Sequence, residues 1–351
     1  MINYIFLITL TLLFALLFGW CFKHLPEERW QILASVPVKK ISPGVWEGMN
    51  VTYYGLFNAN AIVIAVSIFF ILTGAARVPL SVTLATVFVI LLLCLPSSRI
   101  LARLIEKKAY TSTVGGASFV GLLVAPLVLL AMDGARRMIA ADSFESVSIL
   151  AAIAVAYAFG EGLGRLACIS FGCCYGKPLS RCGRVLQAVF RHCSFVFSGK
   201  TKKIAYESGL DGQKVIPIQA VTAVIYVGVG LVGTCLFLQA RFTSAFLIAV
   251  LGVQVWRVVS ETLRADWRGR GNLLTAYQVM SLGGAAYAVF IAAVMPVGHD
   301  LIVSVVDGLR SFLQPGTIIF LTLLWLFCFF YTGRSRVTGS QVTVYVHSSR
   351  I

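Results

Sequence analysis

Charged residues are scarce in this sequence. They make up 12% of the 351 residues, and only 14 residues are acidic and four are histidine. A soluble domain carries charge on about a quarter of its residues, so this composition excludes an ordinary water-exposed globular fold. Hydrophobic residues make up 58% of the chain. They gather in continuous runs of about 20 residues, the length that crosses a bilayer as a helix.

Several other signals are missing as well. The apolar runs do not alternate with polar residues, which argues against a membrane β-barrel. The chain has no phosphate loop, dinucleotide fingerprint or serine hydrolase elbow, so we expect no soluble cofactor. The net charge is +15, but the basic residues lie between the apolar runs, where they contact anionic lipid and set the orientation of the spans. We therefore expect the partner to be a membrane, with no nucleic acid.

The apolar runs predict an all-α, polytopic integral membrane protein with about nine spans. Lipid offers no hydrogen-bond partner to an open backbone, so each span is expected to be a helix. The predicted spans cover residues 2–22, 53–74, 78–96, 114–133, 146–163, 215–239, 243–263, 273–297 and 315–332.

The segments between the spans complete the predicted domain organisation. Residues 1–52 form an extra N-terminal span and a loop, residues 53–298 form the main membrane domain, and residues 299–351 hold the last span and a polar tail. The basic stretch 177–214 is expected to be a small extramembrane head. The segment Leu301–Leu313 is short and amphipathic, and we expect it to lie on the membrane.

Residues 160–178 carry the most unusual run of polar and flexible residues, G-E-G-L-G-R-L-A-C-I-S-F-G-C-C-Y-G-K-P. Glu161 and Arg165 are four positions apart, so they share a helix face and can pair. We expect the span that ends near residue 163 to bring both to a surface. A structural ion pair at the membrane boundary is one interpretation. A functional site is the other, because ionisable groups near lipid are costly.

A second polar constellation lies at residues 254–270. Arg257, Glu261 and Arg264 recur at four- and three-residue spacing on one face of an apolar span. The guanidinium fork suits phosphate because it donates two parallel hydrogen bonds and stays charged. Snorkelling at the interface explains Arg268 and Arg270, but Arg257 should lie deeper. We therefore predict a lipid head-group site, with one half from residues 160–178 and the other from 254–281.

The nine cysteines divide into two groups. Four lie in apolar runs and are expected to be ordinary packing residues: Cys21, Cys94, Cys235 and Cys328. The other five crowd together: Cys168, Cys173, Cys174, Cys182 and Cys193. Their spacing matches no common zinc pattern, so we expect packing rather than a metal. A Cys182–Cys193 disulfide in an oxidising compartment stays open. A nucleophilic thiol needs a base, and the histidine nearest in sequence, His192, lies in a basic loop.

The order of these motifs resembles the prolipoprotein diacylglyceryl transferase family, in particular a divergent branch with G-C-C-Y-G. The family's Y-G-L, G-G-x-S-F-H-G-G, G-R-x-x-N-x-x-N-G-E-x-x-G, H-P-x-Q-x-Y-E and R-x-x-x-E-x-x-R…Q-x-x-S motifs occur in order between Tyr53 and Ser281. The matching residues are Tyr54, Gly55, Leu56, Gly115, Gly116, Ser118, Phe119, Gly121, Gly164, Arg165, Gly172, Gly176, Pro217, Gln219, Arg257, Glu261, Arg264, Gln278 and Ser281.

The departures from these motifs concern groups that handle protons. The family histidine falls on Val120, and the Y-E pair falls on Val221 and Thr222. The remaining polar positions of these motifs are also replaced, by Cys168, Phe171, Cys173 and Ile216. The arginines are present, so the pattern supports phospholipid binding more strongly than it supports catalysis.

The resemblance implies an enzyme of the bacterial plasma membrane that transfers a diacylglyceryl group. The donor would be phosphatidylglycerol and the acceptor the cysteine thiol of a lipobox-bearing prolipoprotein. Arg165 and Arg264 would hold the phosphate and stabilise the departing charge, and Glu161 is the nearest replacement for the missing base. The other substrate-binding residues expected from the resemblance are Tyr54, Gln219, Arg257, Glu261, Gln278 and Ser281.

Two alternatives and one conflict stay open. The chain can be a non-catalytic phospholipid-binding or transport protein, or a transferase for another acceptor in which one of its own cysteines takes part. The loops that share a face with residues 160–178 hold most of the lysines and arginines, so the positive-inside rule predicts that this face is cytoplasmic. The resemblance implies the outer face. We favour it because phosphate-binding arginines inflate the count.

Overall fold

The computed structural model describes residues 1–107, 114–138, 144–266, 274–295 and 302–351. Nine helices within these residues are long and apolar enough to cross a membrane, which confirms the all-α polytopic prediction. They are α1 Ile2–His24, α2 Tyr53–Ala75, α3 Leu80–Glu106, α4 Val114–Met138, α5 Ser146–Phe171, α8 Ile218–Phe237, α9 Phe242–Leu263, α10 Ala276–Val294 and α12 Pro315–Gly333.

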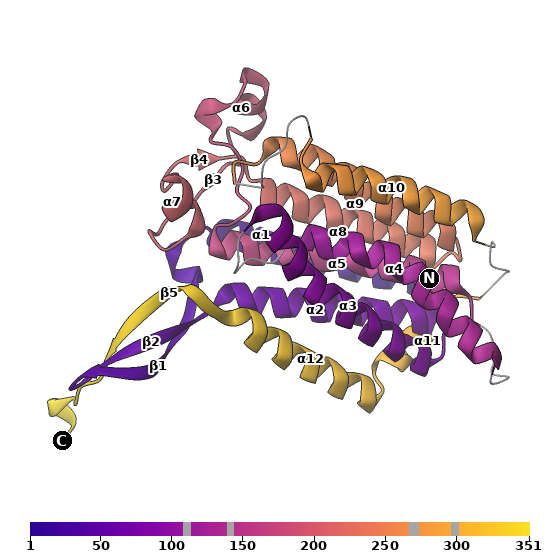
Figure 1. Ribbon diagram of the computed structural model, residues 1–351, viewed down its shortest axis with the longest axis horizontal. Helices are drawn as coiled ribbons and strands as arrows, with labels where there is room; N and C mark the ends of the chain where they lie inside the picture. Colours follow the sequence, from indigo (N-terminus) through magenta and orange to yellow (C-terminus); the bar gives the residue numbers. More distant parts are fainter. Residues whose placement is uncertain (108–113, 139–143, 267–273, 296–301) are drawn as a thin grey trace.

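Helix α5 lies at the centre of the bundle and packs against α1, α2, α4, α8 and α9 (Figure 1). Glycines allow its close contacts, as is common between membrane helices. A Cβ atom added at Gly160 would lie 2.9 Å from the Ala65 side chain, and one at Gly162 would lie 3.2 Å from the Ala223 carbonyl oxygen. The neighbouring Glu161 and Arg165 are therefore carried into the protein interior.

Two predicted helix ends were wrong. Helix α5 continues to Phe171, and Glu161 is 5% exposed, so this residue does not reach a surface. The helix continues because Glu161 and Arg165 pair along one face and the segment contains no proline. Gly172 then ends α5 in a left-handed conformation. Helix α3 likewise continues through Pro96 to Glu106.

An arm of three strands projects from one end of the bundle (Figure 1). It contains β1 Ile32–Ser42, β2 Val45–Thr52 and β5 Arg334–Thr343, antiparallel in the order β1-β2-β5. The prediction of a loop before residue 53 was wrong, and the polar tail forms a strand that the sequence analysis did not predict. Alternating Val, Ile and polar residues favour strands. The second partner of β2 is β5, which lies almost three hundred residues away in the sequence.

The short helix α11, Val305–Phe312, packs against α2. A Cβ added at Gly308 would lie 2.1 Å from the Ile71 carbonyl oxygen, so only glycine permits this contact. The predicted amphipathic helix is present, although Leu301 at the start of the predicted segment lies outside the described residues. Its position on a membrane stays a prediction.

The head predicted at residues 177–214 consists of short elements at the same end of the bundle as the arm (Figure 1). They are η2 Leu179–Arg181, α6 Arg184–Phe190, β3 Phe195–Val196, α7 Lys203–Ser208 and β4 Lys214–Val215, with β3 and β4 paired antiparallel. Its placement outside the membrane stays a prediction.

Lys202 attaches this head to the helix ends. Its Nζ donates to the carbonyl oxygens of Leu25 at 3.1 Å and Ser170 at 2.7 Å. These oxygens belong to the C-terminal ends of α1 and α5, where a cation also meets the negative end of the helix dipole. Burial lowers the pKa of Lys202 to about 8, and the facing charges of Glu28 and Glu27 oppose that shift.

This lowered pKa predicts a stability that rises with pH. An unfolded lysine loses its proton near pH ~10.4, so between about pH 8 and that value the unfolded state binds more protons than the folded state. Over this window we expect the free energy of unfolding of wild type to rise by about 3 kcal/mol relative to that of Lys202→Met. Unfolding in detergent measured against pH tests this, with Lys200→Met at an exposed lysine as the control. Parallel pH curves for wild type and Lys202→Met would contradict it.

Candidate functional site

Glu161 is the central acceptor of a buried polar cluster. The Tyr157 hydroxyl and the Nη2 atoms of Arg165 and Arg257 all donate to its carboxylate, and Arg165 and Arg257 bond to different oxygens. The side chains of Glu161 and Arg257 are 2% and 8% exposed. Buried charges need partners that also satisfy their hydrogen bonds. Here one carboxylate compensates two guanidinium groups, so the cluster keeps a net positive charge.

Arg257 connects three helices around this carboxylate. Its Nη1 donates to the Ser118 Oγ at 2.7 Å and to the Gly115 carbonyl oxygen at 3.4 Å, both on α4. Its Nη2 donates to the Tyr157 hydroxyl of α5 at 2.6 Å. Arg257 itself belongs to α9, deeper than the helix end, as its sequence position predicted.

Arg264 follows the last residue of α9. Its Nε and Nη2 donate to the two carboxylate oxygens of Asp266, each at 2.8 Å, and its Nη1 lies 3.8 Å from a Glu261 oxygen. Its backbone forms a β-bridge with Gly176. This bridge joins the two sequence stretches that were predicted to share a site.

One pocket, here called the polar pocket, collects the predicted charges. It has a volume of about 430 Å³ including its opening. Its charged and amide-bearing lining residues are Glu161, Arg165, Gln219, Arg257, Glu261 and Arg264. Glu261 and Asp266 both accompany Arg264, so the excess positive charge lies at Arg165 and Arg257, which share Glu161. That side of the pocket suits an anion.

Two buried atoms of this lining have no hydrogen-bond partner among the described residues. They are the Arg165 Nε, a donor, and the Gln219 Oε1, an acceptor. The Gln219 amide is held in place because its Nε2 donates to the Cys173 carbonyl oxygen at 2.9 Å. Unsatisfied buried polar atoms are costly. A ligand that carries both an anionic oxygen and a hydroxyl group would satisfy the two together.

A larger apolar cavity adjoins the polar pocket. It has a volume of about 1160 Å³ including its opening, and side chains of α2, α3, α4, α5 and α9 line it. Ser118 and Tyr157 belong to this lining, and both bond to Arg257. Arg257 and the two residues bonded to it therefore separate a positively charged pocket from an apolar cavity.

Comparison with known families agrees with this arrangement. The sequence profile of the prolipoprotein diacylglyceryl transferase family matches residues 44–294, more than half of the chain. The chain belongs to this family. A search of individually curated proteins returns no match. Membership supports a transferase function of the diacylglyceryl type, with a phospholipid donor and a prolipoprotein acceptor in a membrane.

Three residues predicted from the family motifs lie outside the polar pocket lining. The Tyr54 ring packs 5.7 Å from the Phe171 ring. The Gln278 amide forms the capping box of α10 with Thr275 and donates to the Val258 carbonyl oxygen at 3.1 Å. The Ser281 Oγ is buried and has no hydrogen-bond partner in the described part of the chain. Gln278 therefore holds α10 against α9, and direct head-group contacts of the three stay predictions.

The family positions that handle protons have no equivalent group here. Thr222, at the glutamate position, lines the polar pocket. Its hydroxyl donates to the Ile218 carbonyl oxygen at 2.7 Å and accepts from the Trp256 Nε1 at 3.0 Å. The oxygens of Glu161 already accept from three donors, so they are not free to take a proton from an incoming thiol. The hypothesis that Glu161 replaces the base gains no support from this geometry.

Sequence reasoning missed Tyr157 as a member of the site. Tyr157, Glu161 and Arg165 follow one another at four-residue spacing on one face of α5, and that periodicity was the available signal. Ser118 was named only as a motif match, and its bond to Arg257 needed the tertiary structure. Arg268 and Arg270, predicted to snorkel, lie outside the described residues.

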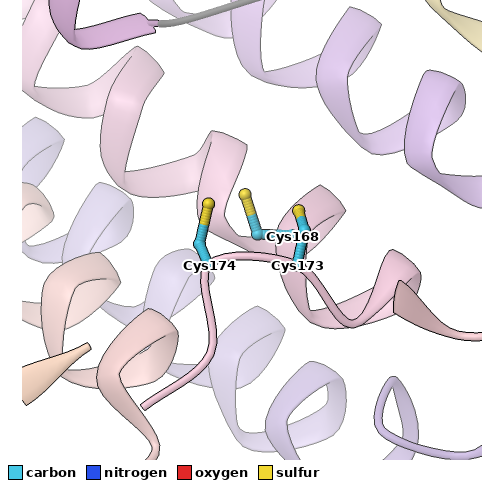
Figure 2. A group of neighbouring side chains, drawn as sticks. All are labelled: Cys168, Cys173 and Cys174. Carbon is cyan, nitrogen blue, oxygen red and sulfur yellow. The ribbon is translucent and has the colours of Figure 1, made fainter. Parts of the chain in front are cut away.

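The structure describes all nine cysteines, and none of them forms a disulfide. The Cys182–Cys193 bond that the sequence left open is therefore not present. Cys168 lies in the last turn of α5, and its sulfur atom lies within 4.8 Å of those of Cys173 and Cys174. Figure 2 shows the three side chains at this helix end and the loop that follows it.

The shared carboxylate predicts a large loss of stability on its removal. Glu161→Gln leaves two buried guanidinium groups without a counter-ion, and we expect it to destabilise the fold by about 3–5 kcal/mol. Asp307→Asn is the matched control, because Asp307 also lies between two arginines, Arg77 and Arg310, but both are mostly exposed. Asp307→Asn should lower the free energy of unfolding by less than about 1 kcal/mol. Unfolding in detergent measures both, and equal losses would contradict the prediction.

Proposed function

We propose that this protein transfers a diacylglyceryl group from phosphatidylglycerol to the cysteine thiol of a lipobox-bearing prolipoprotein in a bacterial plasma membrane. The observation that carries the proposal is the position of the polar pocket. Arg165, Arg257 and Arg264 line it directly beside the apolar cavity. A phospholipid needs both compartments in this order.

The polar pocket suits a phosphoglycerol head group. A phosphate oxygen would accept from the partnerless Arg165 Nε, and a glycerol hydroxyl would donate to the partnerless Gln219 Oε1. Arginine binds phosphate through charge-assisted hydrogen bonds that are stronger than neutral ones. Arg264 is held rigid by its two bonds to Asp266, so it offers charge in a fixed place.

The apolar cavity suits the diacyl part of the same lipid. Except for a few groups such as Ser118, Tyr157 and Gln254, its lining is apolar. The acyl chains of a membrane phospholipid already lie in hydrocarbon, so van der Waals packing, not release of water, would hold them in this cavity. The apolar lining would let the donor keep its acyl chains out of water while its head group reacts.

The reaction is a nucleophilic substitution at carbon. The acceptor thiol loses its proton, its sulfur bonds to the glycerol carbon that carries the phosphate ester, and the carbon–oxygen bond breaks. Glycerol phosphate leaves with the electron pair. Negative charge then grows on the phosphate oxygens, where Arg165 and Arg264 stabilise it. We place this pocket on the outer side of the membrane, in keeping with the family.

A non-catalytic phospholipid-binding protein is the second candidate. The specific observation that favours it is the absence of a free carboxylate or imidazole at the family positions, where Val120 and Thr222 stand. Both candidates bind phosphatidylglycerol through the same arginines, and only the first forms a product.

Lipidation of a lipobox peptide separates these two candidates. Membranes that contain the protein and phosphatidylglycerol should form the thioether product. Arg165→Ala and Arg264→Ala should each lower the rate at least ~100-fold, because each removes charge stabilisation from the departing phosphate. Mass spectrometry of the peptide measures the product.

The control variant is Arg137→Ala, since Arg137 is 71% exposed and pairs with Asp133 away from the pocket. It should keep the full rate. Native mass spectrometry of bound phosphatidylglycerol provides the second readout. Wild type that binds the lipid but gives no product would refute the transferase and favour the binding protein.

A further inference from the structure

Three cysteine side chains meet beside the polar pocket. Cys168 lies in the last turn of α5, and Cys173 and Cys174 follow Gly172. The three sulfur atoms all lie within 4.8 Å of one another, and Figure 2 shows them gathered at the end of the helix. Cys174 also lines the polar pocket, so the cluster is in reach of whatever binds there.

Two left-handed residues bring these thiols together. Gly172 has φ +73°, and the Cys173 backbone N–H then donates to the Cys168 carbonyl oxygen at 3.0 Å. Cys174 has φ +56°, a conformation that costs an ordinary residue about 1 kcal/mol or more. These two turns direct the three side chains of the C-x4-C-C pattern toward one point. The spacing of the cysteines in the sequence does not reveal this convergence.

The surrounding backbone holds the turn in this shape. The Lys177 N–H donates to the Leu263 carbonyl oxygen at 2.9 Å, and the Ala265 N–H donates to the Tyr175 carbonyl oxygen at 3.1 Å. Gly176 fits closely against Ile216, where an added Cβ would lie 2.4 Å from the carbonyl oxygen. Strain that the neighbouring structure maintains is common at functional sites.

Thiolate ligands suit a soft or borderline metal ion. Zinc binds sulfur at about 2.3 Å, so tetrahedral ligands lie about 3.8 Å apart. The present spacing needs a contraction of about 1 Å at most to reach that value. Arg165 lies close enough to Cys168 and Cys174 to interact electrostatically, as Arg264 does with Cys174. These cations would offset the excess negative charge of three thiolates around a divalent ion.

We propose that Cys168, Cys173 and Cys174 bind a Zn²⁺ ion whose fourth coordination position faces the polar pocket and takes the acceptor thiol. This inference rests on the proposed transferase function and supplies the base that it lacks. Catalytic zinc sites have three protein ligands and one open position, and a thiol that coordinates zinc is deprotonated outright.

The proton and the atoms are accounted for in this scheme. A hydroxide in the fourth position accepts the thiol proton and departs as water, while the sulfur takes its place. The coordinated thiolate then attacks the glycerol carbon, the carbon–oxygen bond breaks, and glycerol phosphate leaves toward Arg165 and Arg264. A covalent diacylglyceryl intermediate on one of the three cysteines is excluded by chemistry, because a thioether on a saturated carbon does not release its alkyl group readily.

Metal analysis of the purified full-length protein tests the site. Reduced wild type should hold about one zinc per chain, and cobalt in its place should give a thiolate-to-cobalt charge-transfer band. Serine at Cys168, Cys173 or Cys174 should weaken zinc binding at least tenfold and lose the band. Cys182→Ser is the matched control and should change neither. A protein that takes up neither metal, or in which any two of the three cysteines form a disulfide under reducing conditions, overturns the proposal.

A lipobox peptide provides a readout that does not depend on turnover. Addition of the cysteine peptide should shift the cobalt band, and the serine peptide should not. An unchanged band overturns the open-position assignment. Full lipidation activity in the Cys168/Cys173/Cys174→Ser triple variant overturns the zinc site and leaves the transferase standing. Bound zinc and a shifted band without any lipidated product support the zinc site, and they refute the transferase instead.

Discussion

A single carboxylate shared by two buried guanidinium groups is the constraint on which the rest of the structure depends. Glu161 sits on the central helix α5, and it can hold Arg165 from the same helix and Arg257 from α9 only if the helices approach closely. Gly160 and Gly162 permit the close contacts of the same helix with α2 and α8. In a medium of low polarity an unpaired charge is very costly, so the positions of α4, α5 and α9 are coupled to this one cluster.

The same cluster defines the boundary between two environments. Arg257 bonds toward Ser118 and Tyr157 on the side of the apolar cavity, and it lines the polar pocket with Arg165 on the other side. The charges do not fully cancel, and one guanidinium nitrogen and one amide oxygen lack protein partners. An amphipathic ligand with an anionic head meets each of these conditions, which connects the packing of the helices directly to the chemistry of the family.

This chain has the arginines of the family motifs but lacks the groups in those motifs that handle protons. The arginines that we propose to bind phosphate are present at the family positions, whereas valine and threonine stand where the family has histidine and glutamate. Binding and charge stabilisation depend on the arginines, and activation of the thiol depends on a base. The three cysteines lie within the same stretch as Arg165, so a change in how the thiol is activated needs no change in how the lipid is held.

The nine spans, the paired charges and the two halves of the site followed from the sequence, because hydrophobic length and helical spacing are local properties. Local pattern gave the wrong end for α5 and a loop in place of the β1–β2 arm, and Gln219 was named only through the resemblance to the family. The β2–β5 pairing, the Ser118–Arg257 bond and the focus of Cys168, Cys173 and Cys174 were decided only by the tertiary structure. Each of them joins residues through chain reversals or long-range packing, and no spacing along the sequence encodes that distance.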